Sequence, residues 1–334
     1  MKKILALLLL AAFLTVSCKK QEESKPAPGG PGTGTTPPPA AKLRFAIMPK
    51  ALSIPVFNYA KIGAEREAKI LGNVEIIWDA PDIADPLKQK EKLESLIAQR
   101  VDGIAISCTN SDLLTPTINK AMDLGIPVVT WDSDAPKSKR IAFYGVNDVK
   151  SGEILGENLA KMLNGKGNIA IVTALGADNL ENRLKGAKSA LAKYPGIKIL
   201  ETFDCKDDVL VAKQIIETGT KKFSDLSGWI SVGGWPVFNE NALDSVDTSK
   251  VKVVVFDTIP PAPQVMKKGK VNLLVGQKYF GWGSVPTKLL YDIVVNKKYP
   301  PSPVIDSGVD VVTPENVDAY IEKWKKLESG EITE

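Results

Sequence analysis

The sequence contains no histidine among its 334 residues, and cysteine occurs only three times. Without histidine, the Ser–His–Asp and Cys–His arrangements of nucleophilic catalysis and the usual histidine-containing zinc sites are excluded. Three cysteines are also too few for a zinc site made of cysteine alone. We therefore expect no metal and no cofactor, whereas acid–base chemistry by a pair of carboxylates remains open.

The chain also lacks a strong imbalance of charge, with a formal net charge of +4 at pH 7. Residues 1–17 carry Lys2 and Lys3 as their charged side chains, so their removal lowers this charge by two, to +2. No basic block and no patch of interleaved aromatic and basic residues is present. Nucleic acid is therefore not an expected partner.

The first residues have the pattern of a secretory signal. A basic MKK precedes the apolar run ILALLLLAAFL, which is too short to span a membrane as a mature helix. Cys18 follows directly, and this placement predicts the lipid-modified first residue of a bacterial lipoprotein. Thr15 stands where leucine is usual, and ordinary signal cleavage that leaves Cys18 free is the alternative. We expect residues 1–17 to be a signal peptide and the protein to be extracytoplasmic, anchored to the membrane through lipidated Cys18.

Residues 18–42 are nearly devoid of large apolar side chains and rich in proline and glycine. Such a segment cannot bury enough surface to offset the entropy of ordering. Its prolines favour an extended chain, at about 3.1 Å per residue where it is polyproline-like. We interpret this segment as a disordered tether between the lipid anchor and a folded domain.

From residue 43 onward, apolar runs of strand length alternate with amphipathic helical stretches. Helices are predicted at 57–71, ended by Gly72, at 87–100 and at 115–125. Strands are predicted at 43–48, 73–79, 101–107, 126–132, 141–146, 168–174, 197–203, 228–233, 252–257 and 272–277. Their continuous valine and isoleucine content indicates parallel sheets covered on both faces by helices, which is an α/β fold. Two doubly wound lobes fit this number of strands better than one eight-stranded barrel.

Three of the predicted strands end in an aromatic residue followed by aspartate. The stretches IIWDAP, VVTWDSDAP and VVVFDTIPP place Asp79, Asp132 and Asp257 at strand ends. Ligands of doubly wound sheets bind outside the carboxyl ends of the strands. The same ends carry further candidates, namely Ser107, Gly233, Gly234, Trp235 and Gln277.

The passage VDGIAISCTNSDLLTPTINKAMDLGIPVVTWDSDAP combines a strand, a polar turn, a helix, a second strand and a terminal aspartate. In this order it resembles the sugar-binding proteins of bacterial ABC importers, of the type I periplasmic binding protein fold. The ribose-binding group, which shares its core with LacI-type regulators, is the most similar. The resemblance runs from LRFAIM to about VDAYIEKW and includes SIPVFNYAKIGAEREAKILG, ENRLKGAKSAL, VVVFD and LLVGQ.

The resemblance implies two lobes joined by three crossings, with the ligand held in the cleft between them. One lobe would contain residues 43–146 and 278–306, and the other residues 147–277 and 307–334. It also implies an ABC permease as partner, and we expect a monomer. Regulators with this core carry an N-terminal DNA-binding helix-turn-helix, whereas this chain begins with the signal and tether described above.

The family also implies ligand contacts at particular strand ends. Asp132 stands where the family uses an aspartate to accept hydrogen bonds from sugar hydroxyls, and Asp257 is its counterpart in the other lobe. An ionised carboxylate offers two acceptor oxygens to adjacent hydroxyls. Gln277 matches a glutamine that both donates and accepts, and Arg183 matches an arginine whose fork of donors suits sugar oxygens. The alternatives are turn-capping aspartates and, for Arg183, a salt bridge on a surface helix.

Three aromatic residues are candidates for stacking on a sugar ring. Phe57 matches a stacking aromatic of the family, and Trp131 directly precedes Asp132. Trp235 follows Gly233–Gly234, which leave room beside it, before Pro236 begins a helix. Each of these rings could instead belong to the hydrophobic core.

The remaining positions are weaker candidates. Asp134 and Asp148 belong to this second group, and Tyr279, Phe280 and Trp282 are expected to pack in the hinge rather than to bind. The second-rank binding candidates are Ser133, Asp79, Cys205 and Asn147.

The chain departs from the ribose-binding pattern at several contacts. The group has asparagine where this chain has Ile54 and Ser107, phenylalanine where it has Val56, and arginine where it has Ser133. It has Asn–Asp where this chain has Gly233–Gly234. The resemblance therefore does not carry ribose itself over to this chain.

Three functions remain open at this stage. The first is a non-enzymatic receptor that delivers a small pentose-like or hexose-like sugar to an ABC importer. The second is a receptor of the same fold for a non-sugar polyol, a nucleoside or an autoinducer-like signal. The third is a secreted glycoside hydrolase, which would need two carboxylates about 5–10 Å apart, for which Asp132 and Asp257 are available.

Cys108 and Cys205 are the cysteines of the folded part. An oxidising compartment allows a disulfide, but the resemblance places the two residues in different lobes that must move. We expect two free, buried thiols.

Overall fold

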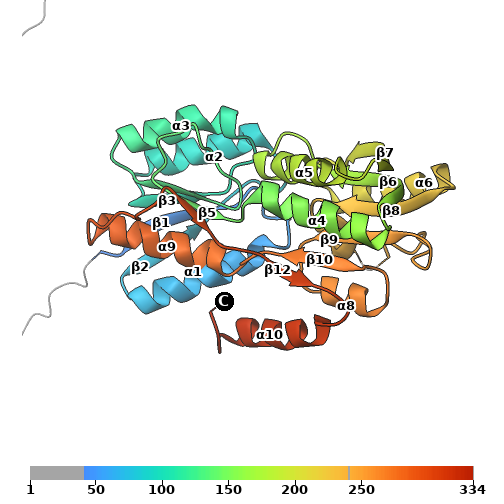
Figure 1. The fold of residues 1–334 in the computed structure, drawn as a ribbon. Helices are drawn as coiled ribbons and strands as arrows, with labels where there is room; N and C mark the ends of the chain where they lie inside the picture. The colour runs from blue at the N-terminus through green and yellow to red at the C-terminus, as the bar shows by residue number, and fades with distance from the viewer. Residues whose placement is uncertain (1–40, 240, 334) are drawn as a thin grey trace, which may run out of the picture. The chain divides into compact units, whose positions relative to one another are not determined.

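The computed structural model describes residues 41–239 and 241–333. The predicted signal peptide, Cys18 and nearly all of the predicted tether lie outside the described residues. The described chain forms two six-stranded sheets with helices on both faces (Figure 1). The prediction of an α/β fold with two doubly wound, mainly parallel sheets is therefore confirmed.

The first sheet has the strand order β11-β5-β4-β3-β1-β2, and all its pairs are parallel. The first strand along the chain, β1, pairs with β2 on one side and with β3 on the other. The strands are β1 (Leu43–Met48), β2 (Val74–Trp78), β3 (Gly103–Ile106), β4 (Val128–Trp131), β5 (Phe143–Gly145) and β11 (Val304–Asp306). The helices around it are α1 (Phe57–Leu71), α2 (Pro86–Ala98), α3 (Ser111–Asp123) and α9 (Gly281–Val294).

The second sheet repeats this plan with the order β12-β10-β9-β8-β6-β7, and only β12 is antiparallel to its neighbour. Its strands are β6 (Lys166–Thr173), β7 (Gly196–Asp204), β8 (Leu226–Ser231), β9 (Lys252–Phe256), β10 (Leu273–Gly276) and β12 (Asp310–Val312). Its helices are α4 (Asp148–Met162), α5 (Asp178–Leu191), α6 (Val209–Lys222), α7 (Trp235–Phe238), α8 (Ala262–Lys267) and α10 (Val317–Ser329).

Alternate side chains of β1 enter different parts of the core. Phe45 and Ile47 pack with α1 and α9 on one face, whereas Ala46 and Met48 pack with α2 and α3 on the other. Successive side chains of a strand point to opposite faces, so a strand covered on both sides must be apolar throughout. Figure 1 shows α9 lying against α1, although the two helices are far apart in the sequence.

The chain passes between the two sheets three times. It leaves β5 for α4, leaves β10 for α9, and runs from β11 directly to β12. The short, partly exposed strands β11 and β12 were not predicted from the sequence, because three residues are too few for a recognisable pattern. Their pairing with β5 and β10 places them at the edges of the two sheets.

Capping residues explain where two of the predicted helices begin or end. Gly72 ends α1 with φ of 81° and donates its N–H to the Ala68 carbonyl, as the sequence predicted. The helix predicted at 115–125 begins earlier, at Ser111. Asn110 caps it by accepting a hydrogen bond from Leu113 N at 2.9 Å, and the proline inside this helix had hidden its true start.

Close contact between α4 and α5 depends on glycine at Gly152 and Gly186. A Cβ atom at Gly152 would lie 1.9 Å from the Arg183 carbonyl oxygen, and one at Gly186 would lie 1.9 Å from the Val149 carbonyl oxygen. The two helix backbones therefore touch, and α5 is held at a fixed height over the second sheet. Arg183 lies on the buried face of α5, so this contact also sets the position of its side chain.

We predict that Gly152→Ala destabilises the protein, because the added methyl group must push α4 away from α5. Overpacking of this kind typically lowers the free energy of unfolding by about 1–3 kcal/mol. Ser189→Ala, on an exposed position of α5, is the control. Thermal unfolding followed by circular dichroism measures both. A Gly152→Ala protein that is more stable, as expected for alanine in an uncrowded helix, would contradict the close contact.

Candidate binding cleft

The carboxyl ends of the two sheets line a common cavity. It encloses about 390 Å³ of empty volume, part of it open to solvent. Its lining comes from both sheets and contains Lys50, Ile54, Val56, Phe57, Asp132, Asn179, Leu180, Arg183, Asp207, Gly233, Gly234, Trp235, Phe238, Asp257, Gln277 and Trp282.

Asp132 and Asp257 occupy equivalent positions at the ends of β4 and β9. The Asp132 N–H donates to the Tyr144 carbonyl at 3.1 Å, and the Asp257 N–H donates to the Val275 carbonyl at 2.7 Å. Each backbone then turns sharply, with φ of 57° and 76° respectively. Side chains other than glycine adopt this region rarely, at a cost of roughly 1–2 kcal/mol. The surrounding sheet holds each of these strained turns in place, and each turn brings its carboxylate to the cavity.

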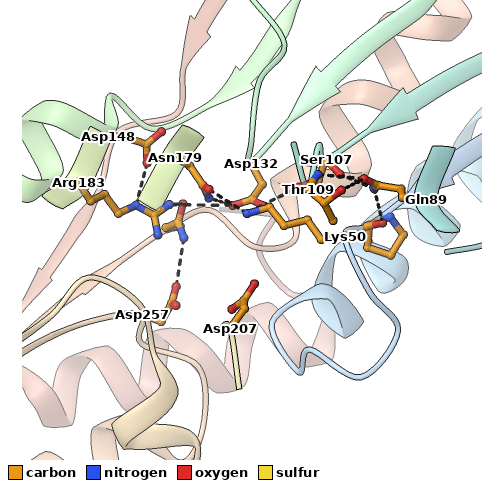
Figure 2. A network of polar contacts seen from close by, with 12 residues as sticks. Lys50, Gln89, Ser107, Thr109, Asp132, Asp148, Asn179, Arg183, Asp207 and Asp257 are labelled. Atoms are coloured by element: carbon orange, nitrogen blue, oxygen red, sulfur yellow. Dashed lines mark hydrogen bonds and ion pairs between the residues drawn. The ribbon is translucent and has the colours of Figure 1, made fainter. Parts of the chain in front are cut away.

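Four side chains lie around the Asp132 carboxylate (Figure 2). Ser107 Oγ donates to its Oδ2 at 2.7 Å, and Asn179 Nδ2 donates to its Oδ1 at 3.3 Å. Lys50 Nζ lies 3.8 Å from Oδ2, and Arg183 Nη2 lies 4.0 Å from Oδ1. Asp132 thus stands between two cations, one from each side of the cleft.

Arg183 is 2% exposed and is not part of a surface salt bridge, which corrects the alternative raised from the sequence. Its Nε donates to Asp148 Oδ1 at 2.8 Å, and its Nη2 donates to Gln277 Oε1 at 3.2 Å. The guanidinium carbon lies 3.8 Å from the centroid of the Phe256 ring, a cation–π geometry. These contacts fix its plane.

Asp257 is held by neutral donors. Gly234 N donates to its Oδ2 at 3.0 Å, and Gln277 Nε2 and Tyr279 Oη donate to its Oδ1 at 3.1 Å and 3.0 Å. Burial raises the pKa of the Asp257 carboxyl, while the positive charge of Arg183 opposes the rise. Gln277 therefore uses its amide in both senses, accepting from Arg183 and donating to Asp257.

The aromatic candidates separate into a cleft group and a core group. Phe57 and Trp235 line the cavity. Trp131 does not: it is 0% exposed and packs edge-on against Phe57, with ring centroids 5.5 Å apart, and against Trp282 at 5.9 Å. Trp131 therefore supports the cavity wall from behind, which corrects the proposal that it contacts the ligand. Trp282 is fully buried and packs against Tyr279, with ring centroids 5.0 Å apart, as expected, and it also borders the cavity.

The turn after β8 explains how Trp235 reaches the cavity. A Cβ atom at Gly233 would lie 2.6 Å from the Trp235 ring, and one at Gly234 would lie 2.2 Å from the Phe238 ring. Both glycines thus leave room for aromatic rings that fold back over the turn, as the sequence suggested for Trp235. The Trp235 indole N–H donates to Asp207 Oδ1 at 2.8 Å.

Ser107, predicted as a ligand contact, and the second-rank candidates lie outside the cavity lining. Ser107 contacts the cleft only through Asp132, and Ser133 is buried next to it. Asp79 pairs with Lys92 Nζ at 2.6 Å, and Asn147 caps α4 by accepting from Lys150 N at 3.1 Å. None of these positions, nor that of Cys205, is consistent with direct contact to a ligand in this cavity.

Asp134 and the two cysteines are structural. Asp134 accepts hydrogen bonds from Arg140, whose Nε and Nη2 each lie 2.5 Å from its oxygens, and so belongs to the turn after β4. Cys108 and Cys205 are free and buried, as predicted. Burial raises the pKa of both thiols, that of Cys205 to about 12, so neither is a reactive thiolate at neutral pH.

Three polar residues of the cleft were not predicted from the sequence. Lys50 follows β1 by two residues, is buried, and donates to Asn179 Oδ1 at 2.8 Å. Asn179 stands at the start of α5, one helical turn before Arg183. Asp207 lies in the loop after β7. Lys50 and Asp207 follow predicted strand ends, so the rule that selected Asp132 applies to them too.

The described residues contain no group of three histidine, cysteine, aspartate or glutamate side chains arranged to hold a metal ion. None of the helices in the described ranges is long and apolar enough to span a bilayer.

Comparison with known proteins yields one consistent family. The pattern described as periplasmic binding protein domain matches residues 45–298. The ribose import binding protein of Bacillus subtilis is 28% identical over 311 residues, which cover 89% of this chain and 95% of that protein. Among solved structures, a solute-binding protein of Burkholderia graminis in complex with D-arabinose is 32% identical with a TM-score of 0.80, covering 84% of this chain and 98% of that one. A solute-binding protein of Actinobacillus succinogenes with bound D-allose is 26% identical with a TM-score of 0.76, covering 84% and 100%.

We predict that Asp148 makes folding stability depend on pH. Burial raises the pKa of Asp148 to about 7 in the folded protein, against about 3.9 in an unfolded chain. Between these values the folded state binds more protons, so the contribution of Asp148 to the free energy of unfolding falls as pH rises through this window. Urea unfolding between pH 4.5 and 7.5 should give a less negative slope for Asp148→Asn than for the wild type. Parallel slopes for the two proteins would contradict the raised pKa.

Proposed function

Because the chain belongs to the periplasmic binding protein family, we propose that it captures a small sugar between its two lobes for an ABC importer. Membership of this family makes the protein an extracytoplasmic binding protein and not an enzyme. The observation that carries the choice of ligand class is the cavity between the sheets, where Asp132, Asp257 and Arg183 converge beside aromatic rings. A permease in the cytoplasmic membrane is the corresponding partner.

The chemistry of this lining suits a polyhydroxylated ring. Carboxylates accept hydrogen bonds from adjacent hydroxyls, and the guanidinium and amide groups donate to ring and hydroxyl oxygens. Phe57 and Trp235 offer apolar faces to the C–H side of a sugar. Trp282 also borders the cavity. The relatives that bind ribose, arabinose and allose support this ligand class.

The binding energy needed is modest. A micromolar complex corresponds to about −8 kcal/mol, and hydrogen bonds to charged groups contribute roughly 1.5–3 kcal/mol each. Because the charged groups are already fixed by mutual contacts, little side-chain entropy remains to be lost on binding.

We further propose that the lobes correspond to residues 43–146 with 278–306, and 147–277 with 307–334. The membership of the strands in the two sheets supports this division, since β11 joins the first sheet and β12 the second. The three segments between the sheets then form the hinge. In the described structure Lys50 of one lobe donates to Asn179 of the other, so the lobes are in contact across the cleft.

We predict that Asp257→Asn weakens sugar binding by about 10- to 100-fold, because a neutral amide replaces a charged acceptor without changing shape. Asp79→Asn, at the equivalent aromatic–Asp motif outside the cavity, should bind as the wild type does. Isothermal titration against a panel of pentoses and hexoses measures both, with chromatographic recovery of the unchanged sugar. Equal affinities for the two variants would mean that Asp257 serves only the turn.

The sequence features of the first 18 residues support a lipid anchor at Cys18. We predict that the wild-type protein incorporates labelled palmitate and sediments with membranes. Cys18→Ser should lose the label while its folded domain remains intact. Labelling that persists in the variant would contradict acylation at this position.

A further inference from the structure

Three negative charges face two positive charges in the cleft, and this imbalance carries information about the ligand. Asp132, Asp207 and Asp257 line the cavity together with Lys50 and Arg183. We propose, on the basis of the sugar-binding function above, that the ligand is a sugar-sized polyol that carries a protonated amino group.

The two cations of the cleft already have carboxylate partners. Lys50 lies 3.8 Å from Asp132, and both side chains are about 4% exposed. Arg183 pairs with Asp148 at 2.8 Å, behind the cavity wall. Asp148 does not line the cavity, so the lining itself holds one more carboxylate than cations whatever the charge of Asp148.

Asp257 and Asp207 form no ion pair among the described residues, although the nearby positive charge of Arg183 acts on Asp257. The hydrogen bonds that Asp257 accepts come from the neutral donors Gly234, Gln277 and Tyr279. Asp207 accepts from the indole of Trp235. No lysine or arginine of the described ranges lies within ion-pair distance of either carboxylate. The adjoining cavity is lined by Lys206 and Asp204 as well, one charge of each sign.

Asp207 is held in place rather than left to solvent. Lys206 and Asp207 both have positive φ, at 55° and 58°. Two consecutive residues in this region are strained, and such strain persists only where the surrounding structure enforces it. Figure 2 shows the Asp207 and Asp257 carboxylates on the same side of the row formed by Arg183, Asn179, Asp132 and Lys50.

An ammonium group suits this arrangement for two reasons. A neutral ligand that covers these two carboxylates removes water from them and leaves the excess negative charge of the lining uncompensated. A bound ammonium group compensates this charge, and it donates three hydrogen bonds. The rings of Trp235 and Phe238 line the same part of the cavity, and aromatic faces attract cations. A neutral sugar would avoid this uncompensated charge only if Asp257 kept a proton in the complex.

The test compares neutral sugars with their amino derivatives. The probes are D-glucose, D-galactose and D-allose, each with its derivatives bearing an amino group at carbon 2, 3 or 6, and the N-acetylated forms of these amines, which are uncharged. Isothermal titration at pH 7 and low ionic strength is run on the wild type, Asp207→Asn and Asp208→Asn. Asp208 is the matched control, because it removes the same charge from the neighbouring residue, which caps α6 and does not line the cleft.

We expect at least one amine to bind the wild type tenfold or more tightly than its parent sugar, with the preference lost on N-acetylation. Asp207→Asn should reduce that preference several-fold, and Asp208→Asn should keep it. Neutral sugars that bind as tightly as, or more tightly than, every amine would overturn this inference and leave the sugar-binding function standing. The inference would also be overturned if Asp207→Asn lowered the affinity for neutral sugars and for amines by the same factor. Failure of all sugars and amines to bind would overturn the inference and the proposed function together.

Discussion

Burial of the Arg183 guanidinium is the constraint on which the rest of the cleft depends. A charge removed from water must be surrounded by acceptors, and Asp148, Gln277 and the Phe256 ring supply them. The close packing of α4 on α5 at two glycines places this side chain at the required depth. Through Gln277 the same guanidinium is connected to Asp257, and across the cavity it faces Asp132. The packing of two helices thus determines where the binding groups of both sheets meet.

Repetition of one plan in two sheets places the acidic groups opposite each other. Each sheet has its fourth chain-ordered strand ending in an aromatic residue and an aspartate with positive φ. The aromatic residues, Trp131 and Phe256, are both fully buried. Trp131 lies directly before Asp132, and the Phe256 ring packs against the guanidinium group of Arg183. The motif therefore consists of a buried ring that fixes the strand end and a strained aspartate that turns into the cavity. At Asp79 the ring is only partly buried and the aspartate pairs with a surface lysine, which is why this copy lies outside the cleft.

Much of the fold and half of the cleft could be predicted because strands and their ends leave strong local signals. The runs of valine and isoleucine predicted ten of the strands, and the helix ending at Gly72 was placed correctly. Asp132, Asp257, Gln277, Phe57, Gly233, Trp235 and Arg183 all line the cavity. Asn179 was missed because an asparagine in the first turn of a helix is an ordinary surface residue by sequence, and Lys50 was missed because lysine is rarely buried even after a strand end. Only tertiary packing buries them against each other. Trp131 was misplaced because it is still the last residue of β4, where helices cover both faces of the sheet, so its ring packs in the core and only the following Asp132 reaches the cleft.

The central claim is that a small polyol binds between the sheets through the carboxylates and the guanidinium at the strand ends. A crystal structure of the protein with its bound ligand tests this claim most directly. The account predicts ligand hydroxyls within about 3 Å of the Asp132 and Asp257 carboxylates and of Arg183, with one face of the ring against Trp235 or Phe57. A ligand bound elsewhere, or one that leaves Asp132, Arg183 and Asp257 in contact only with one another, would contradict it.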